Sequence, residues 1–323
     1  MKGTFVFSLD FELFWGVKDL VNLKVYRENL LGVRIMLPQL LSLFNKYEIN
    51  ATFATVGFLF FENKEELIAA LPQKKPSYKN KNLSPYLNFF EDVGQNELGD
   101  PFHFGKSLVK QIIESKQEIG SHSFCHYYCN EPGQTLEEFE SDINQAVLIS
   151  KKFGQDLKSF VFPRNQVNEG YLNVLVKAGF TNYRGNLKHF MYEYDSFPKL
   201  RWLQRLIRIA DSYINLSGYN NFLPQKTQSG KILNIPASRL LRPFNSRLSF
   251  LEWLRLRRIK LEMTFAAKTK TVYHLWGHPH NYGINIEKNL AFLEEILKHY
   301  SLLRNKYGFI NLSMKDLAKE YGL

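Results

Sequence analysis

The sequence predicts an α/β protein in which a mainly parallel sheet is covered by helices. Short β-rich apolar runs alternate with longer segments of helical periodicity along most of the 323 residues. This alternation is typical of units in which a helix returns the chain so that the next strand lies parallel to the last. About seven or eight such units are present, a number that favours a barrel over an open sheet. Acids and histidines follow several of the runs, where parallel folds place their active sites.

Each predicted strand is a short run rich in aliphatic, β-branched or aromatic residues. The first, residues 4–9, leads into Asp10-Phe11-Glu12, so we expect a buried strand that delivers two carboxylates at its C-terminal end. The run at 159–162 stops at Pro163, which cannot donate a ladder hydrogen bond. The other predicted strands are residues 51–56, 117–120, 180–183, 232–235, 271–276 and 309–312.

Helices are predicted where apolar residues recur every three or four positions. Residues 29–47 show this spacing from Leu30 to Phe44. Residues 135–153 begin with Thr135 and Glu138, the pattern of a capping box, and residues 169–178 stop at Gly179. The other predicted helices are residues 104–115, 249–267 and 286–307, with a short one after 312. Residues 57–103 are less regular, and their lysine-rich part, 73–81, is expected to form a surface excursion near the site.

Composition limits the class of protein. The chain is 45% hydrophobic and carries a formal net charge of +11, which allows a large core and favours anionic partners. No linker or repeat divides it, so we expect one domain over residues 1–323 with an irregular insertion around 185–231. The N-terminus runs into a strand without the pattern of a signal peptide, and no apolar stretch would span a bilayer. A cytoplasmic protein is therefore expected.

Residues suited to metal chemistry follow two of the early strands. Asp10 and Glu12 follow the first, and His122 and His126 follow the strand at 117–120. Residues four apart project from the same face when they share a helical turn, so the two imidazoles are expected to lie together. Two imidazoles and one carboxylate form a ligand set that leaves positions open for water and substrate. A second carboxylate beside the metal can act as a general base.

A third group of candidates follows the late strand at 271–276. This segment offers His274, His278 and His280, any of which could protonate a leaving group. Together with the acids and the first two histidines, such a residue completes the parts needed for metal-assisted hydrolysis of an amide or ester.

In their order and spacing, these elements resemble the polysaccharide deacetylase (NodB-homology) family. The matching stretches are Ser8-Leu9-Asp10-Phe11-Glu12, His122-Ser123-x-x-His126, Phe162-Pro163 and Leu275-x-x-His278, within residues 4–312. The resemblance implies a distorted (β/α) barrel and hydrolysis of N- or O-acyl groups on sugars with one divalent metal ion, commonly zinc.

The resemblance also implies a role for each matching residue. Asp10 would be the general base, and Glu12 would be the carboxylate ligand, where most of the family has an aspartate directly after the base. His122 and His126 would complete the ligand set. His278, chosen by its position in the late motif, would be the general acid.

The chain departs from the family pattern around the proline of the third motif. The family has an arginine two residues before Pro163, but that position is Val161. Arg164 follows the proline instead, and could orient Asp10 or bind an anionic group of the substrate. A backbone N–H after the proline, with the metal, would stabilise the oxyanion. The Asp-x-Glu spacing leaves open whether Asp10 and Glu12 exchange roles.

Two basic segments, residues 201–208 and 250–258, combine arginines with large apolar residues at helical spacing. They could be outer helices with a solvated basic face, or a surface that docks on acidic lipid. Nucleic acid binding is not expected, because no recognition motif accompanies the charge.

The sequence therefore favours a metal-dependent carbohydrate N-deacetylase, with zinc as its expected ion and an acylated aminosugar of a cell-surface glycan or its precursor as substrate. One alternative is a deformylase or amidase acting on a lipid-linked or non-sugar substrate. Another is a non-catalytic glycan-binding module on the same barrel, although the retention of both acids and both histidines argues against it.

Overall fold

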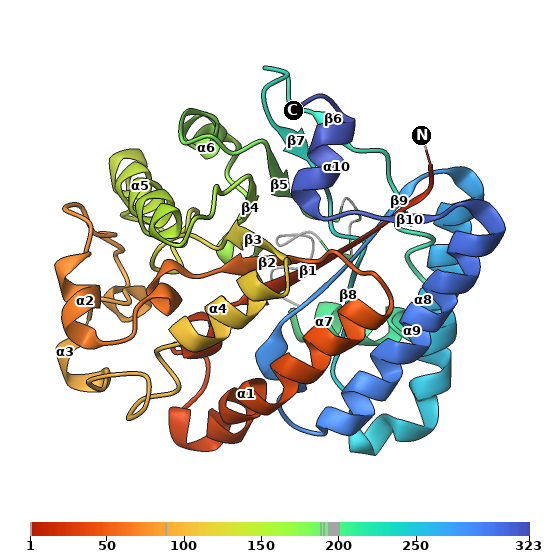
Figure 1. Ribbon diagram of the computed structural model, residues 1–323, viewed down its shortest axis with the longest axis horizontal. Coiled ribbons are helices and arrows are strands. Elements are labelled where there is room, and N and C mark those ends of the chain that lie inside the picture. The colour runs from red at the N-terminus through yellow and green to blue at the C-terminus, as the bar shows by residue number, and fades with distance from the viewer. Residues whose placement is uncertain (1, 88, 188, 190, 193–200) are drawn as a thin grey trace.

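The computed structural model describes residues 2–87, 89–187, 189, 191–192 and 201–323, and its strands form one sheet (Figure 1). The sheet runs in the order β6-β7-β5-β4-β3-β2-β1-β9-β8, with β10 paired to β1, and only the β6–β7 pair is antiparallel. The strands are β1 Thr4–Phe11, β2 Thr52–Thr55, β3 Glu118–Ser121, β4 Ser159–Val161, β5 Asn182–Arg184, β6 Gln225–Lys226, β7 Leu233–Asn234, β8 Arg239–Leu240, β9 Val272–Gly277 and β10 Ile310–Asn311.

One segment closes the sheet into a barrel. Its first part, β7, pairs with β5, and its second part, β8, pairs with β9 at the other end of the strand order. Beyond the two short strands, the N–H of Ser238 donates to the carbonyl of His274 at 2.8 Å. The predicted distorted (β/α) barrel is confirmed. The distortion lies in this shared segment, which gives only two paired residues to each neighbour.

Helices surround the barrel (Figure 1). Each helix predicted from periodicity is present, although the ends shift: the first begins at Leu23 rather than at residue 29, because the Asn22 side chain caps it by accepting from the N–H of Lys24 at 2.8 Å. The capping box of Thr135 and Glu138 forms as expected. The helices are α1 Leu23–Lys46, α2 Lys64–Ala69, α3 Phe89–Asp92, α4 Lys106–Glu114, α5 Leu136–Lys152, α6 Leu172–Lys177, α7 Arg201–Asp211, α8 Glu252–Thr269, α9 Ile286–Tyr307 and α10 Met314–Glu320.

The central strand β1 fixes the position of the site. All eight of its residues are buried, and it pairs with both β2 and β9. Asp10 lies opposite Ala54, and Leu9 lies opposite Gly277, so the carboxyl ends of the three strands share one edge. Side chains that follow these strands therefore meet at one mouth of the barrel.

The excursion between β2 and α4 lies near that mouth, as expected. Most of the lysine-rich stretch 73–81 is irregular and exposed, but Tyr78 within it is fully buried. The Tyr78 hydroxyl accepts a hydrogen bond from the N–H of Tyr128 at 2.8 Å. This contact ties the excursion to the loop that carries His122 and His126.

The prediction of a solvated basic face on residues 250–258 is wrong for two of its arginines. Arg255 and Arg258 are buried, and Arg258 lies 3.1 Å from Glu262 and 3.6 Å from Asp211. Arg239 joins this cluster through Glu262 at 2.7 Å. The ion pairs of Arg258 and Arg239 connect α8 to Asp211 at the end of α7, and removal of one partner would leave the other charge buried and unpaired.

Part of the insertion predicted around 185–231, namely residues 188, 190 and 193–200, lies outside the described residues. The rest includes α7 and β6, and the single-domain boundary stays a prediction. None of the helices in the described ranges is long and apolar enough to cross a membrane.

Candidate metal centre

The two acids project from the same side of the chain at the end of β1. Successive side chains of a strand alternate, so Asp10 and Glu12 share one face while Phe11 points the other way. Both carboxylates are buried. The Glu12 side chain lies against the backbone of Gly16, where an added Cβ would stand 1.9 Å from Cδ of Glu12. Glycine at this position therefore leaves the room that Glu12 needs to reach the site.

The histidine pair lies on an irregular loop rather than on a helical turn, which corrects the expectation from its spacing. β3 ends at Ser121, and Ser123 and His126 both adopt a left-handed backbone with φ of 62°. This backbone brings the two imidazole centroids to 4.9 Å from each other. The four-residue spacing thus brings the rings together by a tight loop, because buried partners outweigh the local cost of two positive φ angles.

Glu12, His122 and His126 form a cluster of three candidate ligands. Oε2 of Glu12 lies 3.1 Å from Nε2 of His122 and 3.1 Å from Nε2 of His126. One ligand atom from each residue lies within 4.8 Å of the others, and all three side chains are buried. Two nitrogens and one oxygen in this arrangement match the ligand set of a catalytic zinc site.

The hydrogen bonding of His122 provides a direct test of that fit. Its Nδ1 lies 2.8 Å from the carbonyl oxygen of Val161, which can only accept, so Nδ1 carries the proton of the neutral ring. Nε2 then presents a lone pair to the Glu12 carboxylate, and this buried atom has no hydrogen-bond partner among the described residues. Two facing lone pairs repel unless a cation lies between them. The residues present therefore fit a divalent metal.

The charge state of the cluster also suits a metal. Burial opposes ionisation of Glu12, but His278, with His126, outweighs it and holds the pKa of this carboxyl well below its usual value. Burial lowers the pKa of His126, which favours the neutral ring. Metal ligands must be deprotonated, and both groups meet that condition near neutral pH.

Asp10 is held by Arg184. The guanidinium donates from Nη1 to Oδ1 at 2.6 Å and from Nη2 to Oδ2 at 2.7 Å, and it stacks over Trp276 at 4.2 Å from the ring centroid. Burial opposes ionisation of Asp10, but Arg184, with His278, lowers the pKa of this carboxyl below its usual value. Asp10 is therefore an oriented carboxylate beside the ligand cluster.

Sequence reasoning missed Arg184, although a signal was present. Arg184 is the last residue of β5 and directly follows the predicted strand at 180–183, so it lies at the same edge as the other candidates. Arg164, which was considered for orienting Asp10, lies elsewhere. It pairs with Asp19 and covers the ring of Tyr128 at 4.6 Å. The contact with Asp10 thus belongs to Arg184, which corrects that assignment.

The three late histidines occupy different places. Nε2 of His274 lies 2.8 Å from the Ser8 hydroxyl, and burial lowers the pKa of His274 to about 3, so it stays neutral. Burial also lowers the pKa of His280 to about 4, and this ring packs edge-on against Tyr26. His278 is the partly exposed one of the three, with 22% of its side chain accessible.

His278 also links the two acids. Its Nε2 lies 3.6 Å from Oδ2 of Asp10 and 3.7 Å from Oε1 of Glu12. The Asn281 side-chain amide approaches Nδ1 of His278 at 3.5 Å, an orientation that leaves the proton on Nε2 facing the site. Access to solvent and this orientation distinguish His278 from His274 and His280 as the candidate general acid.

Asp142 supports the histidine loop, and its removal should weaken metal binding. Its carboxylate accepts hydrogen bonds from the N–H groups of Phe124 at 2.7 Å and Cys125 at 3.1 Å. Burial raises the pKa of Asp142 to about 6, so it is ionised at neutral pH and accepts both bonds. We expect Asp142→Ala to destabilise the metal-free protein by about 1–3 kcal/mol for each orphaned donor and to lower zinc affinity.

Urea unfolding of the metal-free protein and zinc titration against a competing chelator measure the two effects. The exposed Asp156, changed to alanine, is the matched control and should alter neither. Unchanged zinc affinity in Asp142→Ala would show that the loop keeps its shape without these bonds. Burial and the neighbouring Asp142 also raise the pKa of the Cys125 thiol well above its usual value, so this cysteine remains protonated at neutral pH.

The sequence matches a known family over part of its length. Residues 32–183 match the model of the family described as polysaccharide deacetylase. This range includes His122 and His126 but neither Asp10 nor Glu12, whose placement rests on the geometry above. No curated protein sequence matches the chain.

Solved structures extend the similarity to the whole fold. A protein from Mycobacterium smegmatis described as a polysaccharide deacetylase aligns with a TM-score of 0.61 and 11% identity, over 99% of this chain and 90% of that chain. A protein from Pseudomonas aeruginosa PAO1, also described as a polysaccharide deacetylase, aligns with a TM-score of 0.57 and 11% identity, over 98% of this chain and 90% of that chain. PuuE allantoinase aligns with a TM-score of 0.57 and 11% identity, over 98% of this chain and 89% of that chain. The predicted resemblance is confirmed, and at these identities the structures establish the fold alone.

Proposed function

Because residues 32–183 match the polysaccharide deacetylase family and the whole chain shares the fold of proteins described as such, we propose that this protein is a metal-dependent hydrolase that removes an acyl group from an aminosugar. The observation that carries the proposal is the buried cluster of Glu12, His122 and His126 beside an oriented Asp10. Zinc is the expected ion. The substrate is an N-acetylated aminosugar of a cell-surface glycan or its precursor.

The residues of the site have separate roles in the proposed hydrolysis. Glu12, His122 and His126 hold the ion, which when bound would polarise the acyl carbonyl and acidify a water molecule. Asp10 takes the proton from the attacking water, and Arg184 keeps that carboxylate ionised and aimed.

The remaining steps concern the leaving amine and the oxyanion. His278 gives a proton from Nε2 to the leaving amine, since a neutral amine departs more easily than an amide anion. A backbone N–H after Pro163 donates to the developing oxyanion. Arg164, which lies at the rim with 27% of its side chain exposed, is available to an anionic group of the substrate.

Metal analysis and acyl release test the proposal. The purified protein is expected to hold about one equivalent of zinc, to release acetate from N-acetylated aminosugars, to lose this activity with a chelator and to regain it with zinc. Formate release from formylated substrates, measured alongside, would identify the deformylase alternative. A zinc-loaded protein that releases neither acid but binds glycan would contradict hydrolysis and support the binding module.

A membrane surface is the second partner that we propose, on the basis of exposed aromatic residues beside basic ones. Trp202 on α7 is 64% exposed, Trp253 on α8 is 60% exposed, and Phe250 just before α8 is 70% exposed. Arg205 and Arg257 on the same helices are also exposed. Aromatic residues with flanking arginines are typical of surfaces that bind acidic lipid, consistent with a cytoplasmic protein peripheral to the inner face of the membrane.

Liposome sedimentation tests this surface. The protein is expected to sediment with phosphatidylglycerol vesicles at low salt, and Phe250→Ser/Trp253→Ser is expected to reduce the bound fraction several-fold. Leu98, which is 95% exposed elsewhere, gives the matched control as Leu98→Ser. Absence of binding to the anionic vesicles would refute the proposal.

A further inference from the structure

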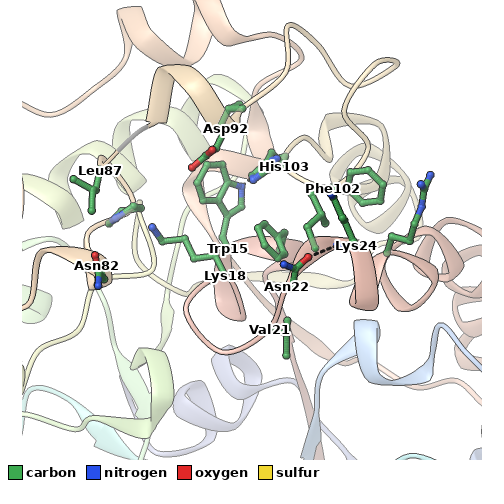
Figure 2. Close-up of a pocket in the computed structure, with 15 residues that line it drawn as sticks. Trp15, Lys18, Val21, Asn22, Lys24, Asn82, Leu87, Asp92, Phe102 and His103 are labelled. Atoms are coloured by element: carbon green, nitrogen blue, oxygen red, sulfur yellow. Dashed lines mark hydrogen bonds between the residues drawn. The ribbon is translucent and has the colours of Figure 1, made fainter.

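A cavity of about 560 Å³ includes Trp15 in its lining and shares none of the candidate metal ligands. Figure 2 shows the residues that line it. The turn after β1 and the start of α1 form one side, through residues 14–27. The excursion between β2 and α4 forms the other, through residues 82–87 and 92–103. The 3-10 helix Leu13–Gly16 separates the cavity from the metal centre, because Gly16 touches Glu12 while Trp15 lines the cavity.

The wall nearest the metal centre is aromatic and fixed. Trp15 is buried, and its Nε1 donates to the carbonyl of His103 at 2.8 Å. Nδ1 of His103 lies 2.7 Å from Asp100, which locks that ring against Phe14 and Trp15 at centroid distances of 5.2 and 4.9 Å. A preformed aromatic wall is typical of a ligand pocket, since binding then costs little ordering of side chains.

The rest of the apolar lining comes from both sides of the cavity. Val21 contributes from the turn before α1, Leu23 from the first residue of α1, and Pro85, Leu87 and Val93 from the excursion. Figure 2 shows Leu87 and Val21 at the margins and Phe102 on the side opposite Leu87. An apolar body of eight or so carbon atoms would find hydrophobic contacts around it.

The charges that line the cavity are mostly positive. Lys18, Lys24 and Arg27 face a single acid, Asp92. Lys18 donates to the carbonyl of Ser84 at 2.7 Å. Among the described residues, Lys24 and Arg27 form no ion pair, and the Arg27 guanidinium lies over the ring of Phe102 at 5.7 Å.

The backbone adds to this positive field. Asn22, Leu23 and Lys24 line the cavity at the N-terminus of α1, a helix of 24 residues. The Asn22 side chain and carbonyl accept from the N–H groups of residues 24–26, but the helix dipole still places a partial positive charge at this N-terminus. The side-chain cations and the helix dipole therefore both favour an anion at this end of the apolar cavity.

We propose that this cavity is a second ligand site, which binds an anionic group carried on an apolar body. The anion, a phosphate monoester or a carboxylate, pairs with Lys24 and Arg27 at the N-terminus of α1. The apolar body lies against Trp15 and Phe102. The ligand needs no contact with the metal cluster, so the inference holds whether or not the chain hydrolyses acylated sugars.

Calorimetric titration of the chelator-treated full chain tests the proposal. Octyl phosphate and octanoate are the two anionic probes, and octyl β-glucoside is the neutral probe of equal chain length. We expect at least one anionic probe to bind about tenfold or more tightly than the glucoside, and the comparison of the two separates phosphate from carboxylate preference. Because the metal is removed, failure of hydrolysis has no bearing on this result.

Variants locate the binding. Lys24→Gln/Arg27→Gln is expected to weaken octyl phosphate or octanoate binding about tenfold or more, and Val21→Trp, which fills the cavity, is expected to weaken all three probes. Lys110→Gln/Lys268→Gln removes the same charge from exposed positions outside the cavity and should change nothing. Equal affinities for charged and neutral probes, or full binding by Lys24→Gln/Arg27→Gln, would overturn the assignment.

Discussion

Asp10→Asn is expected to lower acyl release by about 10²- to 10⁴-fold while zinc remains bound at one equivalent. Asparagine keeps the shape of the side chain and one hydrogen bond to Arg184, but it cannot accept a proton. In contrast, His126→Ala is expected to lose the metal itself, because it removes one of three candidate ligands. Acyl release and zinc content, measured together, therefore distinguish a general base from a metal ligand.

Steady-state kinetics and zinc analysis of the same preparations measure the two effects, with the exposed Asp156→Asn as the matched control. The comparison also decides between the roles of the two acids. If Asp10→Asn lost zinc while Glu12→Gln retained it, the roles would be exchanged. The present geometry favours Glu12 as the ligand, because its Oε2 lies 3.1 Å from both histidine nitrogens whereas Asp10 is occupied by Arg184.

Arg184→Met is expected to destabilise the metal-free protein by about 3–5 kcal/mol, because it leaves the Asp10 carboxylate buried without its partner. Turnover should fall as well, since nothing then holds the base in place. The double variant Arg184→Met/Asp10→Asn should recover much of the stability, because it removes the stranded charge along with its partner. Urea unfolding of the single and double variants gives the coupling between the two residues.

Arg164→Met is the matched control for this experiment. Arg164 also pairs with an aspartate, Asp19, but at the rim of the site with 27% of its own side chain exposed, so its loss should cost less than the loss of the fully buried Arg184. Equal destabilisation by the two variants would mean that the fully buried pair contributes no more than the partly exposed one. The difference in the free energy of unfolding between Arg184→Met and Arg164→Met therefore tests whether burial makes the Arg184–Asp10 pair more important for stability.

The order of strands and helices could be predicted from the sequence because it depends on local patterns. The apolar run before Asp10 and the helical spacing between Leu30 and Phe44 each indicate which side chains of that segment are buried. The same holds for the candidate acids and histidines, since parallel strands end at a common edge. Their catalytic roles stay predictions until the variants above are measured.

Other features depended on contacts between distant parts of the chain. Arg184 meets Asp10 across 174 positions, and the segment around Ser238 closes the barrel by pairing with β5 before it and β9 after it in the chain. Spacing alone suggested a helical turn for His122 and His126, whereas Asp142 and the packed loop impose another backbone.

The sequence by itself therefore determined the elements and the kinds of side chain at their ends. The tertiary structure decided which acid meets the histidines, which arginine holds the other acid, and where a basic cavity opens. The reason is physical: periodicity records whether a side chain is buried, but the partner of a buried charge is set by the register of strands and the path of loops.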